Sequence, residues 1–424
     1  MRIAVPMAGR VARARAAAKR LTIPRPRCRL RRMVQVSDRV RGVTASGGDG
    51  WGLYHRARPL EAAGRRIVDL TIGEPDLRTD PAILDAMAAS ARGGHTGYAA
   101  LRGTDALRDA VAARVAARTG VPTTRRNVLI TTGGQAALFA ALMGAIEPGD
   151  GVVFPDPYYT TYPGTIRAAG GRALAVTTRA EEAFQPRRAD LEAACDARTA
   201  TLLVNTPNNP TGAVYGPDTL AGIGGLARDR DLWVIADEVY DTQVWSGRHQ
   251  SLRALPAMAS RTLTIGSLSK SHAMTGSRIG WLLAPDDAID AIAQLTTHTT
   301  FGVPGFVQDA ALFALGRGPD FESRIAALFR RRRDACVDRL AAQDMVGVIP
   351  SGGAMYLMLD IRATGLSGTD FALRLLETHS IAVMPGESFG RAAAGHLRLA
   401  LTQEDDVLLT ALDTLLSFTM EIAR

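Results

Sequence analysis

The sequence predicts an α/β fold in which helices cover both faces of a large, mostly parallel sheet, followed by a smaller α+β domain. Between residues 127 and 284, short continuous apolar runs alternate with helical stretches, which is typical of a parallel sheet buried on both faces. After residue 316, a long basic helix leads into mixed strands and helices. The chain has 424 residues, 46% of them hydrophobic, which is enough for a large core and more than one compact unit.

Several short strands and a helix are predicted for the large domain. Apolar or β-branched runs predict strands at 128–132, 152–154, 199–205, 232–237, 262–266 and 279–284. A helix at 135–146 ends at Pro148-Gly149. In parallel sheets, ligands bind beyond the carboxyl ends of the strands. The unusual residues fall in the loops at these ends, at 133–134, 205–212, 237–240 and 267–270.

The C-terminal hundred residues have a different pattern. We expect helices at 324–340, 371–379 and 404–419, and strands at 355–361, 381–384 and 396–401. The predicted division is a basic, disordered tail at 1–45, a segment at 46–75 that joins the small domain, a large domain at 76–315 and a small domain at 316–424.

The positive charge is confined to the N-terminal tail. The chain has a net charge of +8, but residues 1–41 carry thirteen basic residues against one acidic residue, Asp38, so the rest of the chain is slightly acidic. This excludes a nucleic-acid-binding body, which needs a basic face on the fold. The tail itself is compatible with a disordered extension, a targeting peptide, or a segment that binds nucleic acid or anionic lipid.

The composition also argues against a membrane-spanning protein and against a protein held together by disulfides or zinc. No uninterrupted run of about 18 apolar residues occurs, so we expect no membrane span. The three cysteines, Cys28, Cys195 and Cys336, are far apart and lack metal-ligand spacing. This predicts a reducing, cytoplasmic location with no metal site and no disulfides.

The small number of lysines suggests a reactive role for one of them. Of 50 basic residues only Lys19 and Lys270 are lysines, and Lys270 is the only one outside the tail. Arginine is permanently protonated, whereas a buried lysine can lose its proton and attack a carbonyl. Lys270 follows an apolar strand, so the sequence indicates that a neutral amine is required there.

Such a lysine suggests pyridoxal 5'-phosphate, whose ring needs specific neighbours. Asp237, at a strand end, can hold a proton on the pyridine nitrogen, and Asn209 and Tyr240 can bind the phenolic oxygen. A phosphate needs free backbone N–H groups at a helix start and a cation. The candidates for this anion site are Gly133, Gly134, Gln135, Arg278, Ser267 and Ser269.

Four motifs in this order resemble those of the class I/II, or fold-type I, pyridoxal-phosphate-dependent aminotransferases. They are Asn-Thr-Pro-Asn-Asn-Pro-Thr-Gly at 205–212, Asp-Glu-Val-Tyr at 237–240, Ser-Leu-Ser-Lys at 267–270 and Gly-Ser-Arg-Ile-Gly at 276–280. The resemblance runs from about residue 50 to the C-terminus. It implies the fold-type I architecture, transamination by a ping-pong mechanism, and Lys270 as the Schiff-base lysine and proton shuttle.

The resemblance also implies roles that the residues alone do not suggest. It implies that Tyr158 stacks on the cofactor ring and that Tyr98 reaches the phosphate in the neighbouring subunit of a homodimer with shared active sites. Arg398 and the backbone N–H of Gly73 would bind the α-carboxylate of the substrate, together with Asn209. No metal is implied.

The substrate is left open. Residues 267–276, 306–311 and 350–353 are similar to the subgroup that holds arginine:pyruvate and aspartate-type transaminases. The arginine type is favoured because 296–304 contains no arginine for a second carboxylate. The side-chain contacts are expected from Trp51, Tyr54 and 297–302. Three alternatives stay open: a C–S lyase, another biosynthetic enzyme such as a decarboxylase or cyclase on the same scaffold, and a transcriptional regulator. The last needs a DNA-binding domain that the 41-residue tail is too short to form.

Overall fold

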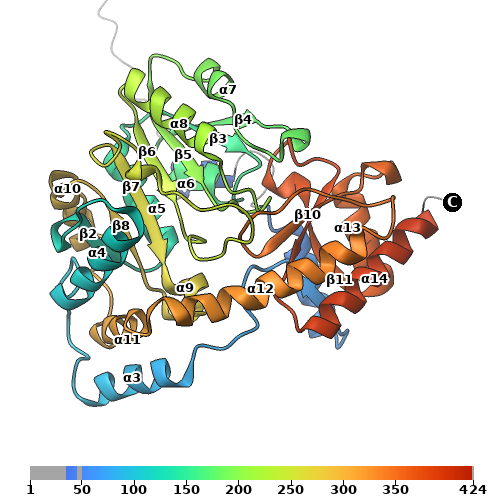
Figure 1. Ribbon diagram of the computed structural model, residues 1–424, viewed down its shortest axis with the longest axis horizontal. Helices are drawn as coiled ribbons and strands as arrows, with labels where there is room; N and C mark the ends of the chain where they lie inside the picture. Colours follow the sequence, from blue (N-terminus) through green and yellow to red (C-terminus); the bar gives the residue numbers. More distant parts are fainter. Residues whose placement is uncertain (1–34, 45–49, 423–424) are drawn as a thin grey trace, which may run out of the picture. The chain divides into compact units, whose positions relative to one another are not determined.

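The computed structural model describes residues 35–44 and 50–422 (Figure 1). By its contacts the chain divides into Met1–Ser37 and Asp38–Arg424, and the second unit is described here. Most of the predicted tail, with Lys19 and Cys28, lies outside the described residues. Within 38–422, no helix is long and apolar enough to cross a membrane.

The larger sheet has seven strands in the order β2-β8-β7-β6-β5-β3-β4. β8 is antiparallel to both of its neighbours, and all other pairs are parallel. The predicted mostly parallel α/β sheet is therefore confirmed. Its strands are β2 (Val128–Thr131), β3 (Gly151–Asp156), β4 (Arg172–Thr177), β5 (Thr199–Asn205), β6 (Trp233–Asp237), β7 (Thr262–Ser267) and β8 (Gly280–Leu283).

β4 is the one strand of this sheet that was not predicted. It lies at the sheet edge, and only Val176 among its six residues is buried. Its sequence therefore lacks the continuous apolar run by which the central strands are recognised.

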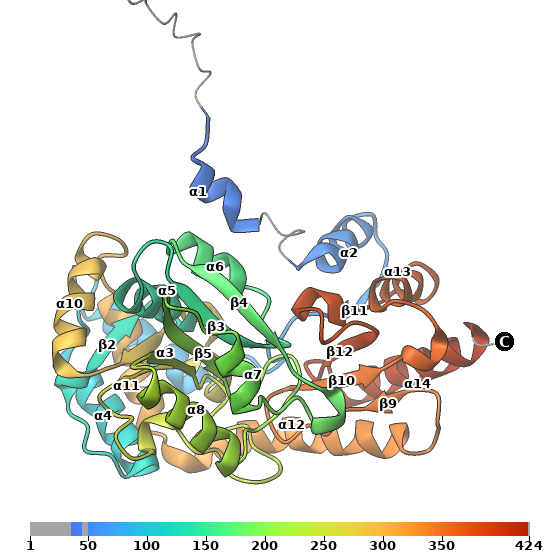
Figure 2. The same ribbon diagram turned by 90° about the horizontal axis from the view of Figure 1, so that it is seen from above.

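Helices cover both faces of this sheet because successive strand residues point to opposite sides. In β3, Val152 and Phe154 pack with the helices of one face and Val153 with those of the other. One face is covered by α5 (Gly134–Ala145), α6 (Tyr162–Ala168) and α10 (Asp286–Thr297). The other is covered by α3 (Pro81–Arg92), α4 (Asp105–Thr119), α7 (Arg188–Ala193), α8 (Pro217–Asp229) and α11 (Gly305–Leu315) (Figure 2).

The smaller sheet has the strand order β1-β11-β12-β10-β9 and lies at the C-terminal, red end of the ribbon (Figure 1). Its strands are β1 (Val68–Leu70), β9 (Gly347–Val348), β10 (Tyr356–Asp360), β11 (Ile381–Pro385) and β12 (His396–Ala400). β1, from the N-terminal part of the chain, pairs in parallel with β11, so both ends of the chain build this sheet. Its helices are α2 (Gly52–Ala62), α12 (Gly318–Leu340), α13 (Gly368–His379) and α14 (Asp405–Ile422).

The start of the second unit differs from the predicted tail, which extends to residue 45. Residues Asp38–Arg41 form α1, and Gly42–Thr44 form a 3-10 turn. The Arg167 guanidinium on α6 donates to the carbonyl of Val43 from Nε at 3.1 Å and from Nη2 at 2.6 Å. These residues therefore pack on the large domain and are not a free extension.

Short helical elements lie in the loops that connect these strands and helices in both parts of the second unit. They are α9 (Leu268–Ser271) and the 3-10 turns Arg125–Asn127, Ala180–Glu182, Leu252–Ala254, Thr275–Ser277, Arg362–Thr364 and Gly386–Phe389.

Candidate active site

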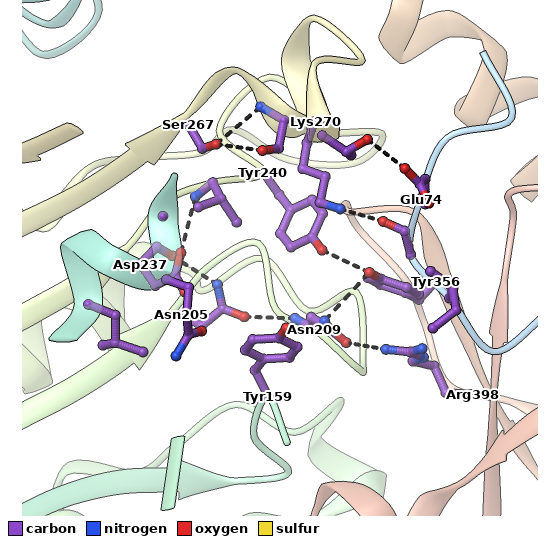
Figure 3. Close-up of a pocket in the computed structure, with 18 of the residues that line it drawn as sticks. Glu74, Tyr159, Asn205, Asn209, Asp237, Tyr240, Ser267, Lys270, Tyr356 and Arg398 are labelled. Atoms are coloured by element: carbon purple, nitrogen blue, oxygen red, sulfur yellow. Dashed lines mark hydrogen bonds between the residues drawn. The ribbon is translucent and has the colours of Figure 1, made fainter. Parts of the chain in front are cut away.

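A cavity of about 300 Å³ lies at the carboxyl ends of β5, β6 and β7 and reaches β12 of the smaller sheet (Figure 3). It gathers residues that lie up to 347 positions apart in the sequence, from Trp51 to Arg398. Eleven of the predicted site residues line it: Gly73, Gly134, Gln135, Asn209, Asp237, Tyr240, Ser267, Ser269, Lys270, Arg278 and Arg398.

The amine of Lys270 is positioned by α9, a single helical turn that directly follows β7. The Ser267 side chain caps this turn by accepting from the N–H of Ser269 at 3.1 Å. The Nζ of Lys270 donates to the carbonyl oxygen of Gly73. Burial lowers the pKa of Lys270 from 10.5 to about 8, because a buried ammonium loses its hydration. About one tenth of this amine is therefore uncharged at pH 7, against less than about one in a thousand for an ordinary lysine.

The carboxylate of Asp237 ends β6 and is 8% exposed. Its Oδ2 accepts a hydrogen bond from the Tyr162 hydroxyl at 2.7 Å, and its Oδ1 accepts a long one from the Val239 N–H at 3.3 Å. Burial nevertheless raises the pKa of Asp237 from 3.8 to about 6, because desolvation outweighs the two hydrogen bonds. Sequence analysis did not identify Tyr162, which comes from α6 on a different part of the chain.

The start of α5 forms a cradle suited to an anion. Gly133 adopts φ +85°, and a Cβ there would lie 2.6 Å from Nη2 of Arg278. The backbone can therefore approach the guanidinium closely only because this residue is glycine. Arg278 donates to the carbonyl of Thr275 at 2.8 Å, and it has no carboxylate within 4 Å in the described chain. The helix start and this unpaired cation favour a bound phosphate.

Arg398 on β12 is a buried guanidinium, only 1% exposed. It donates from Nη1 to Oδ1 of Asn209 at 2.9 Å and from Nη2 to the carbonyl of Thr71. Its Nε has no hydrogen-bond partner, and no carboxylate of residues 35–44 or 50–422 forms an ion pair with it. Leaving such a charge unpaired costs several kcal/mol, so Arg398 is suited to bind a carboxylate that enters the cavity.

Tyr356 on β10 joins these groups, and no sequence motif marks it. Its hydroxyl lies 2.8 Å from the Tyr240 hydroxyl and accepts from Nδ2 of Asn209 at 3.5 Å. Its ring lies 4.4 Å from the guanidinium carbon of Arg398. A Cβ on Gly73 would overlap this hydroxyl, at 1.8 Å. Tyr356 therefore fixes the relative positions of the groups on both sides of the cavity.

Three predicted site residues do not line the cavity. Gly133 lies just behind it, against Arg278. Tyr158 packs edge-on against Phe154, with ring centroids 5.1 Å apart, and its neighbour Tyr159 lines the cavity instead. Tyr98 is 91% exposed and stacks edge-on with Phe301 at 5.0 Å.

The expected side-chain contacts of the substrate are only partly brought together. Trp51 lines the cavity, whereas Tyr54 lines a separate surface cavity and 297–302 line neither. Within the described residues, no cluster of three or more His, Cys, Asp or Glu side chains could hold a metal ion.

The chain matches a family model described as aminotransferase class I and II over residues 65–415. It is 38% identical to the arginine–pyruvate transaminase AruH of Pseudomonas aeruginosa over 369 residues, covering 87% of this chain and 94% of that protein. It is 36% identical over 362 residues to an aspartate/prephenate aminotransferase of Thermus thermophilus, covering 84% and 92%.

Solved structures agree with this match. A double mutant of Thermus thermophilus aspartate aminotransferase superposes with a TM-score of 0.85 at 33% identity, covering 92% of this chain and all of that one. The aspartate aminotransferase of Thermotoga maritima gives 0.85 at 32% identity, covering 90% and 99%.

Proposed function

This chain belongs to the family of class I and II aminotransferases, and we propose that it moves the amino group of an L-amino acid to pyruvate or 2-oxoglutarate by a ping-pong mechanism on pyridoxal 5'-phosphate. The observation that carries the proposal is the pairing of a buried lysine amine with a buried carboxylate in one cavity. Lys270 is the only lysine after the tail, and both it and Asp237 line the cavity.

The donor set of the cavity fits this cofactor. The amine of Lys270 can bond to its carbonyl carbon, and the start of α5 with Arg278, Ser267 and Ser269 can hold its phosphate. When bound, the cofactor stores the amino group and withdraws electrons from the α carbon of the substrate.

The side chains of the chain then have separate roles. Asp237 holds a proton on the pyridine nitrogen, and Tyr240 and Asn209 donate to the phenolic oxygen. With the cofactor bound, Lys270 would serve as a general base and then a general acid, holding at its Nζ the proton that leaves the α carbon of the substrate. Arg398 and the Gly73 N–H orient the α-carboxylate.

Two aromatic residues have proposed roles at the edges of the site. Tyr159 lines the cavity, and we propose that this residue, not Tyr158, stacks on the cofactor ring. Tyr98 is exposed in this chain, which supports its proposed contact with the phosphate in the partner of a homodimer. The proposal includes a cytoplasmic location, supported by the cysteine usage.

The proposed amino donor is of the arginine type. Lys270, Arg278 and Arg398, the cations that line the cavity, already have roles toward the cofactor or the α-carboxylate. A donor with a second carboxylate would find no further cation among the described lining residues. The similarity to the arginine–pyruvate transaminase supports the same choice.

The test is to replace Lys270 and to follow both spectrum and products. In Lys270→Ala, we expect loss of amino transfer and of the visible absorbance of the covalently held cofactor. A variant with the wild-type spectrum would overturn the assignment. In the wild type, amino transfer that depends on a 2-oxo acid separates the proposal from elimination, which would release pyruvate and ammonia without an acceptor.

A further inference from the structure

We propose that Glu74 and Trp51 form a subsite that binds the guanidinium of the amino donor, and this rests on the proposed aminotransferase function. Both residues line the cavity, and neither has a role in holding the cofactor or the α-carboxylate. A carboxylate and an aromatic face are the two groups that recognise a guanidinium, by bidentate hydrogen bonds and by cation–π stacking.

The charges of the cavity wall leave Glu74 as its one unassigned ionic group. The lining residues include two carboxylates, Asp237 and Glu74. Asp237 is buried and tied to Tyr162, whereas Glu74 is exposed at the mouth. Within residues 35–44 and 50–422, no basic side chain forms an ion pair with Glu74, although burial lowers the pKa of Lys270 and the negative charge of Glu74 raises it in part. The electrostatic preference of this end of the cavity is therefore for a cation.

Glu74 is held in place by a neutral donor. The hydroxyl of Thr275 donates to Oε1 of Glu74 at 2.6 Å, while Oε2 accepts no hydrogen bond from the described part of the chain. Figure 3 shows Glu74 on the same side of the cavity as Lys270. A hydroxyl fixes the carboxylate without neutralising its charge, and the remaining lone pairs can accept two N–H groups of a guanidinium.

The spacing suits a long donor that is charged at both ends. Arg398, the proposed α-carboxylate site, donates to the carbonyl of Thr71. Glu74 follows Thr71 by three residues, so the backbones of Thr71 and Glu74 are at most about 11 Å apart along an extended chain. This upper limit keeps Glu74 within reach of a long, flexible side chain whose α-carboxylate is bound at Arg398. Trp51, at the start of α2, lines this same cavity.

The test compares L-arginine with L-citrulline, whose side chain has the same length and a similar shape but carries no charge. We expect the wild-type holoenzyme to prefer L-arginine in kcat/KM. In Glu74→Gln, the ratio of kcat/KM for L-arginine to that for L-citrulline falls by about 10-fold, the scale of one charged hydrogen-bonding pair. An effect of the lost charge on Lys270 acts on both donors and cancels in this ratio. Trp51→Leu lowers the preference in the same direction.

The matched control is Glu147→Gln, which removes the same charge from an exposed residue that lines neither this cavity nor the surface cavity beside it, and it leaves the preference unchanged. A second measurement is inhibition by 5-guanidinopentanoate, which has no amine to transfer. Its inhibition constant rises about 10-fold in Glu74→Gln, whereas that of hexanoate does not.

Three results would overturn the subsite. The first is an equal loss for both donors in Glu74→Gln, which would make Glu74 a structural contact. The second is a wild type without preference for L-arginine. The third is activity with neutral or acidic donors only, and this last result would leave the aminotransferase function intact. Loss of transfer from every donor would instead overturn the proposed function.

Discussion

We expect the ionised carboxylate of Asp237 to be required for amino transfer and, at the same time, to lower the free energy of unfolding of the cofactor-free protein. Burial raises the pKa of Asp237 from 3.8 to about 6, and a difference of about 2 in pKa corresponds to about 3 kcal/mol. At neutral pH the ionised carboxylate therefore destabilises the cofactor-free fold. In Asp237→Asn the amide oxygen can still accept from the Tyr162 hydroxyl, now 2.7 Å from Oδ2, and no charge is buried.

The pKa of Asp237 determines how the stability difference between Asp237→Asn and the wild type changes with pH. Between pH 3.8 and 6 the folded state holds the Asp237 proton more tightly than the unfolded state, so the contribution of Asp237 to stability is lost as pH rises through that window. The stability gain of Asp237→Asn over the wild type should grow by about 1.4 kcal/mol from pH 5 to pH 7.5. The site-independent pH effects cancel in this difference.

The assay is urea unfolding of both proteins without cofactor at the two pH values, together with amino transfer by the loaded enzymes. We expect Asp237→Asn to be more stable at pH 7.5 and at least about 100-fold less active. A stability difference that is the same at both pH values, or a variant of unchanged activity, would refute the reasoning.

Two further substitutions test residues that line the cavity, and a third serves as a control. Arg398→Ala should lower kcat/KM for amino donors by about 100-fold or more, because a buried charged pair with the substrate is lost; an unchanged KM and kcat would contradict the carboxylate role. Tyr159→Ala should weaken cofactor retention, measured by dialysis and absorbance, whereas Tyr158→Ala should lower the melting temperature through its contact with Phe154 and leave retention unchanged. Equal retention in both variants would argue against stacking by Tyr159.

The sequence predicts the positions of candidate site residues well where a buried strand ends next to one polar residue. Asp237 ends β6, and Lys270 follows β7 within a single turn. A buried strand and the polar residue after it are local features, so the sequence reveals both. The edge strand β4 is missed for the converse reason, because only one of its six residues is buried.

The positions of the aromatic residues in and around the cavity depend on contacts between distant parts of the chain, which no local sequence pattern predicts. Tyr356 reaches Tyr240 across 116 positions, and Tyr162 reaches Asp237 across 75. Tyr158 and Tyr159 are adjacent and chemically identical, so only the turn into α6 determines which ring faces the cavity. The docking of residues 38–44 through Arg167 likewise depends on tertiary packing and not on composition.

The most direct test of the central claim, that Lys270 bonds to pyridoxal 5'-phosphate, is reductive trapping. Borohydride reduction of the loaded protein, followed by digestion and mass spectrometry, identifies the modified peptide. Because the chain has only two lysines, the outcome is unambiguous. We predict one stoichiometric adduct on Lys270, lost in Lys270→Ala. An adduct on Lys19 alone, or none in a protein that still transfers amino groups, would contradict the account.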